Sequence, residues 1–356
     1  MPSAPLVSPL SLLSPYAKIL HFLQTRPSSA TVPAPFVNPG ALVVLSSTPG
    51  DLMSKARPYK PGTTWFVTRR TCLGTFRFVP KRAINAVFTF ALALAAVITG
   101  VKIHAFSVMP NHAHMVVTDH ETKARLPDFL RIYHSLVALA LGRIQRTPGP
   151  VWDSRGPDLK ILVGPKTILN KIGYTLTNPV AANLCRNPES WYGAMSAIDA
   201  MGAGPRAQKR PRRFAAAVTT IKARYDLTLT IPKAFGDISP EDYRRLVREH
   251  VQARAARINA GRRGRVLNKT MIQTRDPFDR PTGDPSSKRP DQSGRPRAYR
   301  HIECDPELRD EALAELLGFR LAYRDAYERW RNGHHDVVFP CGTWAVVQYH
   351  GARAPG

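Results

Sequence analysis

The sequence predicts an α+β fold, in which an antiparallel sheet of ferredoxin-like type is covered by helices on one face and followed by a basic, mainly helical C-terminal extension. Strand-like and helix-like segments alternate in the order β-α-β-β-α-β between residues 63 and 163, and a hairpin stands between two long helices. The chain has 356 residues and a formal net charge of +25. That charge indicates a polyanionic partner and excludes an acidic solvating tail.

Each element of the predicted sheet follows from a local pattern. β-branched and aromatic residues mark the first strand, and the turn residues Pro110 and Asn111 join two further strands into the hairpin. Apolar residues at i, i+3 and i+4 mark the helices, and Asn178-Pro179 is expected to end the last one. Strands are expected at 63–71, 101–108, 112–118 and 159–163, and helices at 80–99, 127–146 and 165–177.

Composition divides the chain into four parts. Residues 1–60 are rich in Pro, Ser and Ala and are predicted to be a disordered leader, whereas 62–193 hold the sheet. Residues 194–238 are interpreted as a basic linker, and 239–356 as a basic C-terminal extension that is helical with a terminal β-hairpin at 337–349. One helix of the extension is expected to begin at Ser239-Pro240 and another at Pro306, capped by Asp305.

The apolar segment 83–101 is almost long enough to cross a bilayer, for which about 20 residues are needed. It contains Asn85 and runs directly into a strand pattern, so we interpret it as a core helix and expect no membrane partner. The four cysteines are far apart and form no C-x-x-C pair, which indicates neither a disulfide framework nor a zinc ribbon. Four widely spaced cysteines without a disulfide framework fit a protein of the reducing cytoplasm.

Two histidines stand two residues apart in the predicted strand 112–118. Side chains two apart in a strand point to the same face, so His112 and His114 can present both imidazoles to one divalent cation while Ala113 faces away. Such a pair leaves coordination positions open for a substrate oxygen. Taken alone, the pattern is weak evidence for a metal site and favours two exposed strand histidines.

The context of this pair resembles the HUH motif of the single-tyrosine transposases, specifically the REP-associated tyrosine transposases. The histidine-hydrophobe-histidine strand follows Val-Met-Pro-Asn, and three further segments match in the same order, at 65–70, 149–152 and 171–182. The resemblance covers residues 62–193, little more than a third of the chain. It implies that this part is an HUH transposase-like catalytic domain.

The resemblance implies cleavage and joining of single-stranded or hairpin DNA during transposition. In the family, two histidines hold Mg²⁺ or Mn²⁺, and a tyrosine on a helix attacks the scissile phosphate to leave a 5′-phosphotyrosine and a free 3′-OH. A phenol with a pKa of about 10 is a poor nucleophile at neutral pH, so help from a metal is reasonable on physical grounds. A cytoplasmic, nucleoid-associated protein is expected, as a monomer or a homodimer.

The helix expected at 127–146 carries one tyrosine, Tyr133, which is predicted to be the nucleophile. Tyr133 lies on the apolar stripe of that helix, so packing in the core is its alternative role. The family commonly has a polar third metal ligand one turn after the nucleophile, where this chain has Val137, which cannot bind a metal. Tyr174 is the runner-up nucleophile, and its alternative role is in scaffold that ends the helix at 165–177.

Basic residues supply the predicted DNA contacts. Arg69 and Arg70 end the first strand, where they could follow a DNA backbone or form an ordinary solvated surface. Residues 201–300 hold 24 Lys and Arg against 9 Asp and Glu, which favours phosphate contacts from this region. The residues predicted to make them are Lys209, Arg210, Arg212, Arg213, Arg262, Arg263 and Arg265.

Two other functions remain open from the sequence. A domesticated, non-catalytic nucleic-acid-binding protein would keep the fold and the histidines without a usable tyrosine, and Val137 favours this reading. A metal-dependent nuclease that activates water would need no tyrosine at all.

Overall fold

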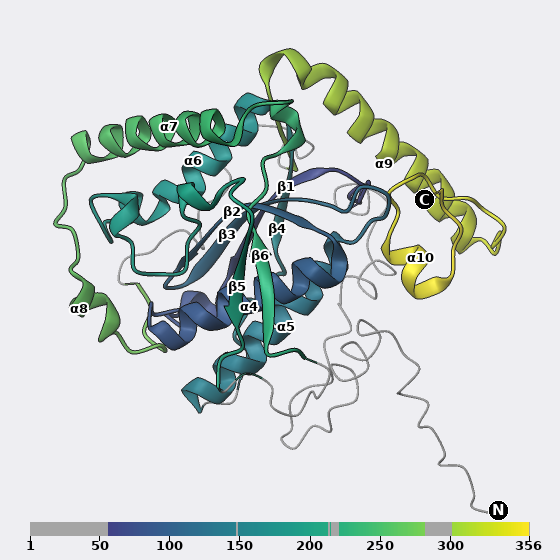
Figure 1. Ribbon diagram of the computed structural model, residues 1–356. Helices are drawn as coiled ribbons and strands as arrows, with labels where there is room; N and C mark the ends of the chain where they lie inside the picture. The colour runs from purple at the N-terminus through teal and green to yellow at the C-terminus, as the bar shows by residue number, and fades with distance from the viewer. Residues whose placement is uncertain (1–55, 147–148, 213, 215–220, 282–300, 356) are drawn as a thin grey trace, which may run out of the picture.

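The computed structural model describes residues 56–146, 149–212, 214, 221–281 and 301–355. All but the last few residues of the predicted leader lie outside these ranges. The described chain folds around one five-stranded sheet with helices packed against it (Figure 1). The predicted α+β fold is confirmed.

The sheet has the strand order β2-β3-β1-β4-β7. The first three pairings are antiparallel, and β7 pairs parallel with β4 at one edge. β7 was not predicted, because its three residues are too short to carry a periodic pattern. The strands are β1 (Thr64–Arg70), β2 (Lys102–Met109), β3 (His112–Thr118), β4 (Asp158–Val163) and β7 (Ile302–Cys304).

Helices cover both faces of the sheet, which corrects the prediction of one covered face. α4 (Arg82–Thr99) and α5 (Leu126–Gln145) lie on one side, and α6 (Pro165–Ala181) with α7 (Pro240–Ala260) on the other (Figure 1). The one-face prediction failed because α7 belongs to the extension and α6 follows the last strand of the predicted β-α-β-β-α-β unit, so neither lies between its strands.

The apolar helix α4 is a core element, as expected. It is long and apolar enough to cross a membrane by composition, yet most of its length is buried inside the protein. Phe88 and Phe90 are fully buried, and Phe88 packs edge-on against Phe78 with ring centroids 4.9 Å apart. Gly100, at a φ of 73°, ends the helix in the left-handed conformation that glycine adopts without strain.

α6 does not end at Asn178-Pro179 but continues to Ala181, which corrects the predicted break. Pro179 lies in the last turn and removes one backbone donor from it, and the helix ends two residues later. The carbonyl of Pro179 then accepts from the backbone N–H of Leu184 at 2.9 Å. Asn178 therefore stays helical, one turn after Tyr174.

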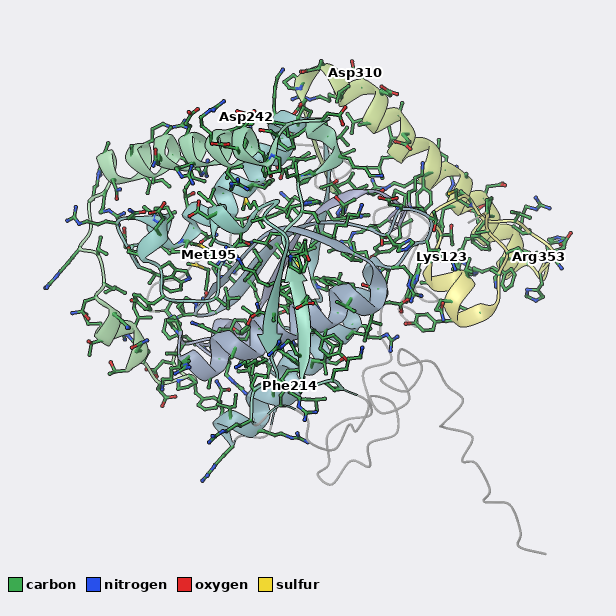
Figure 2. All side chains as sticks on the ribbon, viewed as in Figure 1. Lys123, Met195, Phe214, Asp242, Asp310 and Arg353 are labelled. Carbon is green, nitrogen blue, oxygen red and sulfur yellow. The ribbon has the colours of Figure 1, made fainter. Side chains whose placement is uncertain are left out.

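Part of the predicted linker 194–238 is a small antiparallel sheet, which corrects that interpretation. Its strands are β5 (Pro205–Lys209) and β6 (Arg224–Thr228). Both lie against α4: Tyr225 of β6 contacts Phe90 at 5.6 Å between ring centroids, and Phe214, labelled in Figure 2, contacts the same ring at 4.7 Å. Apolar residues between the basic ones hold the segment to the core.

The C-terminal extension joins the sheet through β7 and then forms α9 (Arg309–Arg331) and α10 (Ala345–His350), while α8 (Lys269–Gln273) lies earlier. The predicted terminal hairpin is wrong, since 345–350 are helical and only a bridge between Val338 and Arg353 remains. Asp305 does not cap its own helix. Its carboxylate instead accepts from the backbone N–H groups of Lys166 at 3.1 Å and Thr167 at 2.6 Å, at the start of α6.

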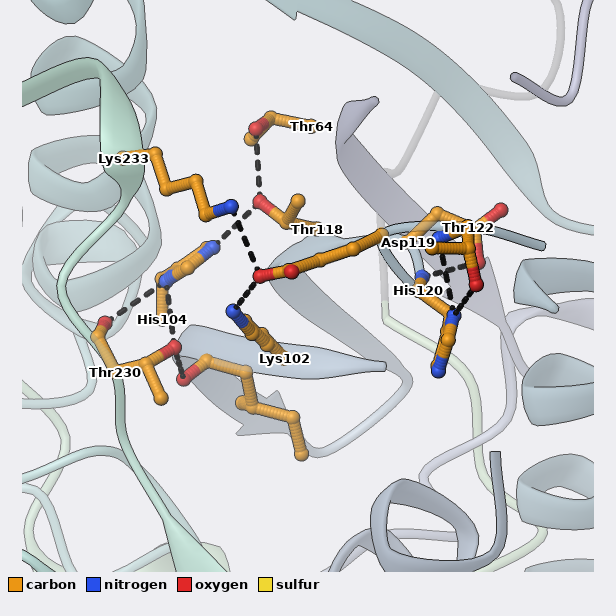
Figure 3. A network of polar contacts seen from close by, with 11 residues as sticks. Thr64, Lys102, His104, Thr118, Asp119, His120, Thr122, Thr230 and Lys233 are labelled. Atoms are coloured by element: carbon orange, nitrogen blue, oxygen red, sulfur yellow. Dashed lines mark hydrogen bonds and ion pairs between the residues drawn. The ribbon is translucent and has the colours of Figure 1, made fainter. Parts of the chain in front are cut away.

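The buried side chain of His104 links β2 to β3 and to the segment after β6 (Figure 3). One ring nitrogen of His104 lies 2.8 Å from the carbonyl of Thr230, and the other lies 2.7 Å from the hydroxyl of Thr118. Thr118 also bonds Thr64 across the strands at 2.8 Å. Burial lowers the pKa of His104 to about 4, against a lesser rise from the Thr230 bond and a further fall from Lys102.

This depressed pKa predicts a loss of stability in acid. The unfolded chain binds a proton at His104 below a pH of about 6.5 while the folded chain does not, so the contribution is complete above that pH and is lost progressively toward pH 4. Between pH 7 and pH 5 the loss is about 2 kcal/mol. We expect urea unfolding of His104→Gln to depend less on pH than wild type by about this amount. An equal pH dependence in both proteins would contradict the assignment.

Candidate active site

His112 and His114 lie on one face of β3, as the spacing predicts. Their ring centroids are 4.7 Å apart. His114 pairs with Thr68 across the ladder, and its Nδ1 lies 2.9 Å from the Thr68 hydroxyl oxygen. The Nδ1 of His112 lies 2.7 Å from the side-chain oxygen of Asn111. Each imidazole is therefore oriented at Nδ1 by a neighbouring side chain, as is usual for histidines that bind metals through Nε2.

The chemistry of His114 fits a metal ligand. Its Nε2 is buried and has no hydrogen-bond partner in the described part of the chain, an arrangement that is costly unless another group satisfies it. Burial, followed by the charges of His112, Lys171 and Arg70, holds the pKa of His114 well below its usual value. The ring is thus neutral at neutral pH, with a lone pair available for a cation.

Residues beyond the two histidines do not complete a metal site of the usual kind. Among the described residues, no group of three or more His, Cys, Asp and Glu side chains is placed to hold one ion. A third ligand would therefore come from another residue type or from a substrate oxygen. Asn178, buried and one turn after Tyr174 on α6, has an amide oxygen of the required kind.

α6 places Tyr174 directly against His114. The Tyr174 ring lies 5.3 Å from the His114 ring and 5.8 Å from the Phe66 ring, edge-on to both. Phe66 in turn stacks on His114 at 5.3 Å, with 14° between the ring planes. Tyr174 is half-buried rather than enclosed, so its side chain is partly accessible.

Two cations lie over the Tyr174 ring. The Lys171 ammonium is 5.4 Å from the ring centroid, and the Arg254 guanidinium, from α7, is 5.6 Å from it. Lys171 forms an ion pair of 2.7 Å with Glu303 of β7. Burial raises the pKa of Glu303, but bonds from Lys160 and Lys171 outweigh it and hold that pKa below its usual value. The face that carries the histidines therefore also carries positive charge that suits a phosphate.

Tyr133 lies elsewhere, which contradicts its predicted place beside the histidines. It is 1% exposed and packs against Phe129 at 6.1 Å and against Phe88 of α4 at 6.3 Å. Burial raises the pKa of Tyr133 well above its usual value, so its hydroxyl is a very poor nucleophile. The apolar stripe that the sequence revealed on α5 directs this side chain into the core.

The sheet itself separates Tyr133 from the histidines. Successive strand residues face opposite ways, and Thr68 faces His114 while Arg69 faces the other side. Arg69 lies 5.9 Å over the ring of Trp152, whose indole N–H donates to the carbonyl of His134 on α5 at 2.8 Å. α5 is therefore packed on the face opposite the histidine pair.

The predicted DNA contacts at the end of β1 are divided between the two faces. Arg70 is exposed and pairs with His112 in the ladder, so it lies on the face of the candidate site. Arg69 lies on the α5 face against Trp152, and burial, offset in part by Asp153, lowers its pKa to about 10. Only Arg70 is brought close to the histidines.

The other predicted DNA contacts do not gather at the site. Lys209, Arg210 and Arg212 are exposed beside the β5–β6 sheet on the α4 side, and Arg213 lies outside the described residues. Arg263 and Arg265 are exposed in the segment after α7.

Arg262 makes hydrogen bonds within the fold, and its predicted DNA contact stays a prediction. It donates to the side chain of Asn183, to the carbonyl of Val180 at 3.1 Å and to the side chain of Asn259 at 2.6 Å. These hydrogen bonds connect the C-terminal end of α7 with the C-terminal end of α6.

Lys171, Arg254 and Glu303 are the site residues that sequence reasoning missed. Lys171 lies within a segment that resembles the transposases, but nothing in the sequence indicates its contact with Tyr174. Arg254 is one of several arginines on α7, and no pattern in the sequence pairs α7 with α6. Glu303 lies on the unpredicted strand β7.

No protein-family model matches the chain, and a search of curated proteins finds no match. Among solved structures, the chain is similar to a REP-associated tyrosine transposase bound to a REP hairpin. The match has 19% identity and a TM-score of 0.33, and it covers 38% of this chain and 78% of the other. In its motifs and in the order of its elements, the chain resembles the REP-associated tyrosine transposases.

Proposed function

We propose that this protein nicks and rejoins single-stranded or hairpin DNA through a covalent bond to Tyr174, as a cytoplasmic, nucleoid-associated transposase. The observation that carries the proposal is the contact between the rings of Tyr174 and His114 on one face of the sheet. Tyr174 thus replaces Tyr133 as the nucleophile. Asn178, one helical turn after Tyr174, would then be the polar third ligand, which Val137 could not be.

His112 and His114, with Asn178, would hold Mg²⁺ or Mn²⁺. The ion, when bound, would supply Lewis-acid polarisation of the scissile phosphate. Binding through Nε2 requires that Nδ1 of His114 carries the proton and donates to the Thr68 hydroxyl, which the observed contact of 2.9 Å allows. The Thr68 hydroxyl can accept this bond, so the contact is compatible with the tautomer that the proposal needs.

Tyr174 would supply the covalent step. Its hydroxyl oxygen attacks the phosphorus, the bond from phosphorus to the 3′-oxygen breaks, and a 5′-phosphotyrosine and a free 3′-OH result. The phenolic proton passes to water, and the departing 3′-oxygen takes up a proton. Because the ester keeps the bond energy, attack by a 3′-OH rejoins the strand without a nucleotide cofactor.

The proposal is tested by incubation with Mn²⁺ and labelled hairpin DNA, followed by a denaturing gel. A protein-linked DNA band supports the proposal. Cleavage without such a band would indicate attack by water, and a shift on a native gel without cleavage would indicate the non-catalytic binding protein. A parallel reaction with EDTA establishes whether the adduct depends on the metal.

A further inference from the structure

We propose that Arg254 of α7 positions the phosphodiester that Tyr174 attacks, so that the C-terminal extension supplies part of the site. This inference rests on the proposed function and adds a residue outside the segments that resemble the transposases. Arg254 lies about 60 residues beyond the end of that resemblance, at residue 193. Its guanidinium nevertheless lies 5.6 Å from the Tyr174 ring.

Gly173 allows α7 to approach this closely. A Cβ atom at Gly173 would lie 2.5 Å from a ring carbon of His250 and 3.8 Å from the Cδ of Arg254. The first distance is far below a normal contact, so a side chain at 173 would require the His250 ring of α7 to move. His250 and Arg254 of α7 therefore occupy the space beside Tyr174 that a side chain at position 173 would fill.

The guanidinium is held in a fixed direction. Its Nε donates to the hydroxyl oxygen of Thr177 at 3.0 Å, and the Thr177 hydroxyl donates to the carbonyl of Gly173 at 2.7 Å. The bond at Nε leaves the two terminal nitrogens to bind a ligand, and the fork of an arginine matches the oxygens of a phosphate. Both anchoring residues belong to α6, so Arg254 and Tyr174 are positioned by the same helix.

Ion pairing also distinguishes Arg254 from Lys171. Lys171 forms an ion pair of 2.7 Å with Glu303, which also pairs with Lys160 at 2.8 Å, whereas no ion pair joins Arg254 to a carboxylate in the described part of the chain. No protein carboxylate therefore competes with a phosphate for the Arg254 guanidinium. An anionic phosphodiester is the ligand that this charge and this geometry suit.

The test measures binding of a short fluorescein-labelled oligothymidylate in EDTA, at several salt concentrations and without cleavage. Each phosphate neutralised on a single strand contributes about −0.7 to the slope of log K against log salt. We expect Arg254→Ala to weaken binding and to make the slope shallower by about 0.7, and Arg254→Lys to retain most of the slope. Arg257→Ala, which removes an exposed cation from the same helix, is the matched control and is expected to keep the wild-type slope.

Equal changes of the salt slope in Arg254→Ala and Arg257→Ala, or no change of the slope in either variant, would overturn the inference. The phosphate contact would then be general to the helix in the first case and absent in the second.

Adduct formation on hairpin DNA with Mn²⁺ provides a separate measurement, in which Arg254→Ala is expected to form the adduct more slowly by about tenfold or more. If wild type forms no adduct while the slope difference holds, the phosphate contact stands and the proposed tyrosine chemistry fails. If wild type forms the adduct and the slopes agree, only the role of Arg254 fails.

Discussion

Tyr174→Phe is expected to abolish the covalent protein–DNA adduct, whereas Tyr133→Phe is expected to form it at nearly the wild-type rate. The first change removes the oxygen that would become the phosphate ester and keeps the ring that packs on His114 and Phe66. The second removes a hydroxyl buried in the core on the opposite face of the sheet. The measurement is the protein-linked band on a denaturing gel with labelled hairpin DNA and Mn²⁺.

Folding and DNA binding serve as controls for this pair. Both variants should keep the wild-type circular dichroism spectrum and shift the same DNA on a native gel, because each changes one oxygen and no carbon. An adduct in Tyr174→Phe, together with its loss in Tyr133→Phe, would restore the nucleophile that the sequence alone favoured.

His114→Ala is expected to lose metal-dependent cleavage, by at least about a hundredfold, because its Nε2 is the buried nitrogen without a protein partner. His112→Ala should behave in the same way, since the two rings lie side by side on one strand face, edge-on with centroids 4.7 Å apart. Calorimetric titration with Mn²⁺ should show weaker binding in both variants. The rate of adduct formation is measured over a range of Mn²⁺ concentrations.

His120→Ala is the matched control for the two histidine variants. His120 follows β3 at its other end and contacts Thr122, so its loss should leave both Mn²⁺ binding and cleavage unchanged. Because His114 also stacks on Phe66, its variant is first compared with wild type in thermal unfolding. A stable His114→Ala protein that cleaves at the wild-type rate would remove the histidines from the reaction.

The part of the site that lies on one strand could be predicted from the sequence. The two-residue period of a strand is local, so the shared face of His112 and His114 needs no knowledge of the rest of the fold. The bounds of β3 were likewise predicted, because Pro110 and Asn111 mark the preceding turn. For the strands β1 to β4, local patterns and the final structure agree closely.

The partner of the histidines could not be predicted in this way. Tyr133 and Tyr174 both lie on amphipathic helices after the motif, and the choice depends on which face of the sheet each helix covers. That choice is a matter of tertiary packing, which the periodicity of one helix does not contain. For the same reason, the contact of Arg254 with α6 and the pairing of β7 with β4 were missed.

Peptide mapping by mass spectrometry identifies the residue that forms the covalent bond to DNA. The protein is incubated with hairpin DNA and Mn²⁺, the DNA and protein are digested, and the peptide that keeps a nucleotide phosphate is identified. We expect the nucleotide to be attached to Tyr174 and to be absent when EDTA is present. A nucleotide on Tyr133 or on any other residue, or cleaved DNA without any modified peptide, would contradict this expectation.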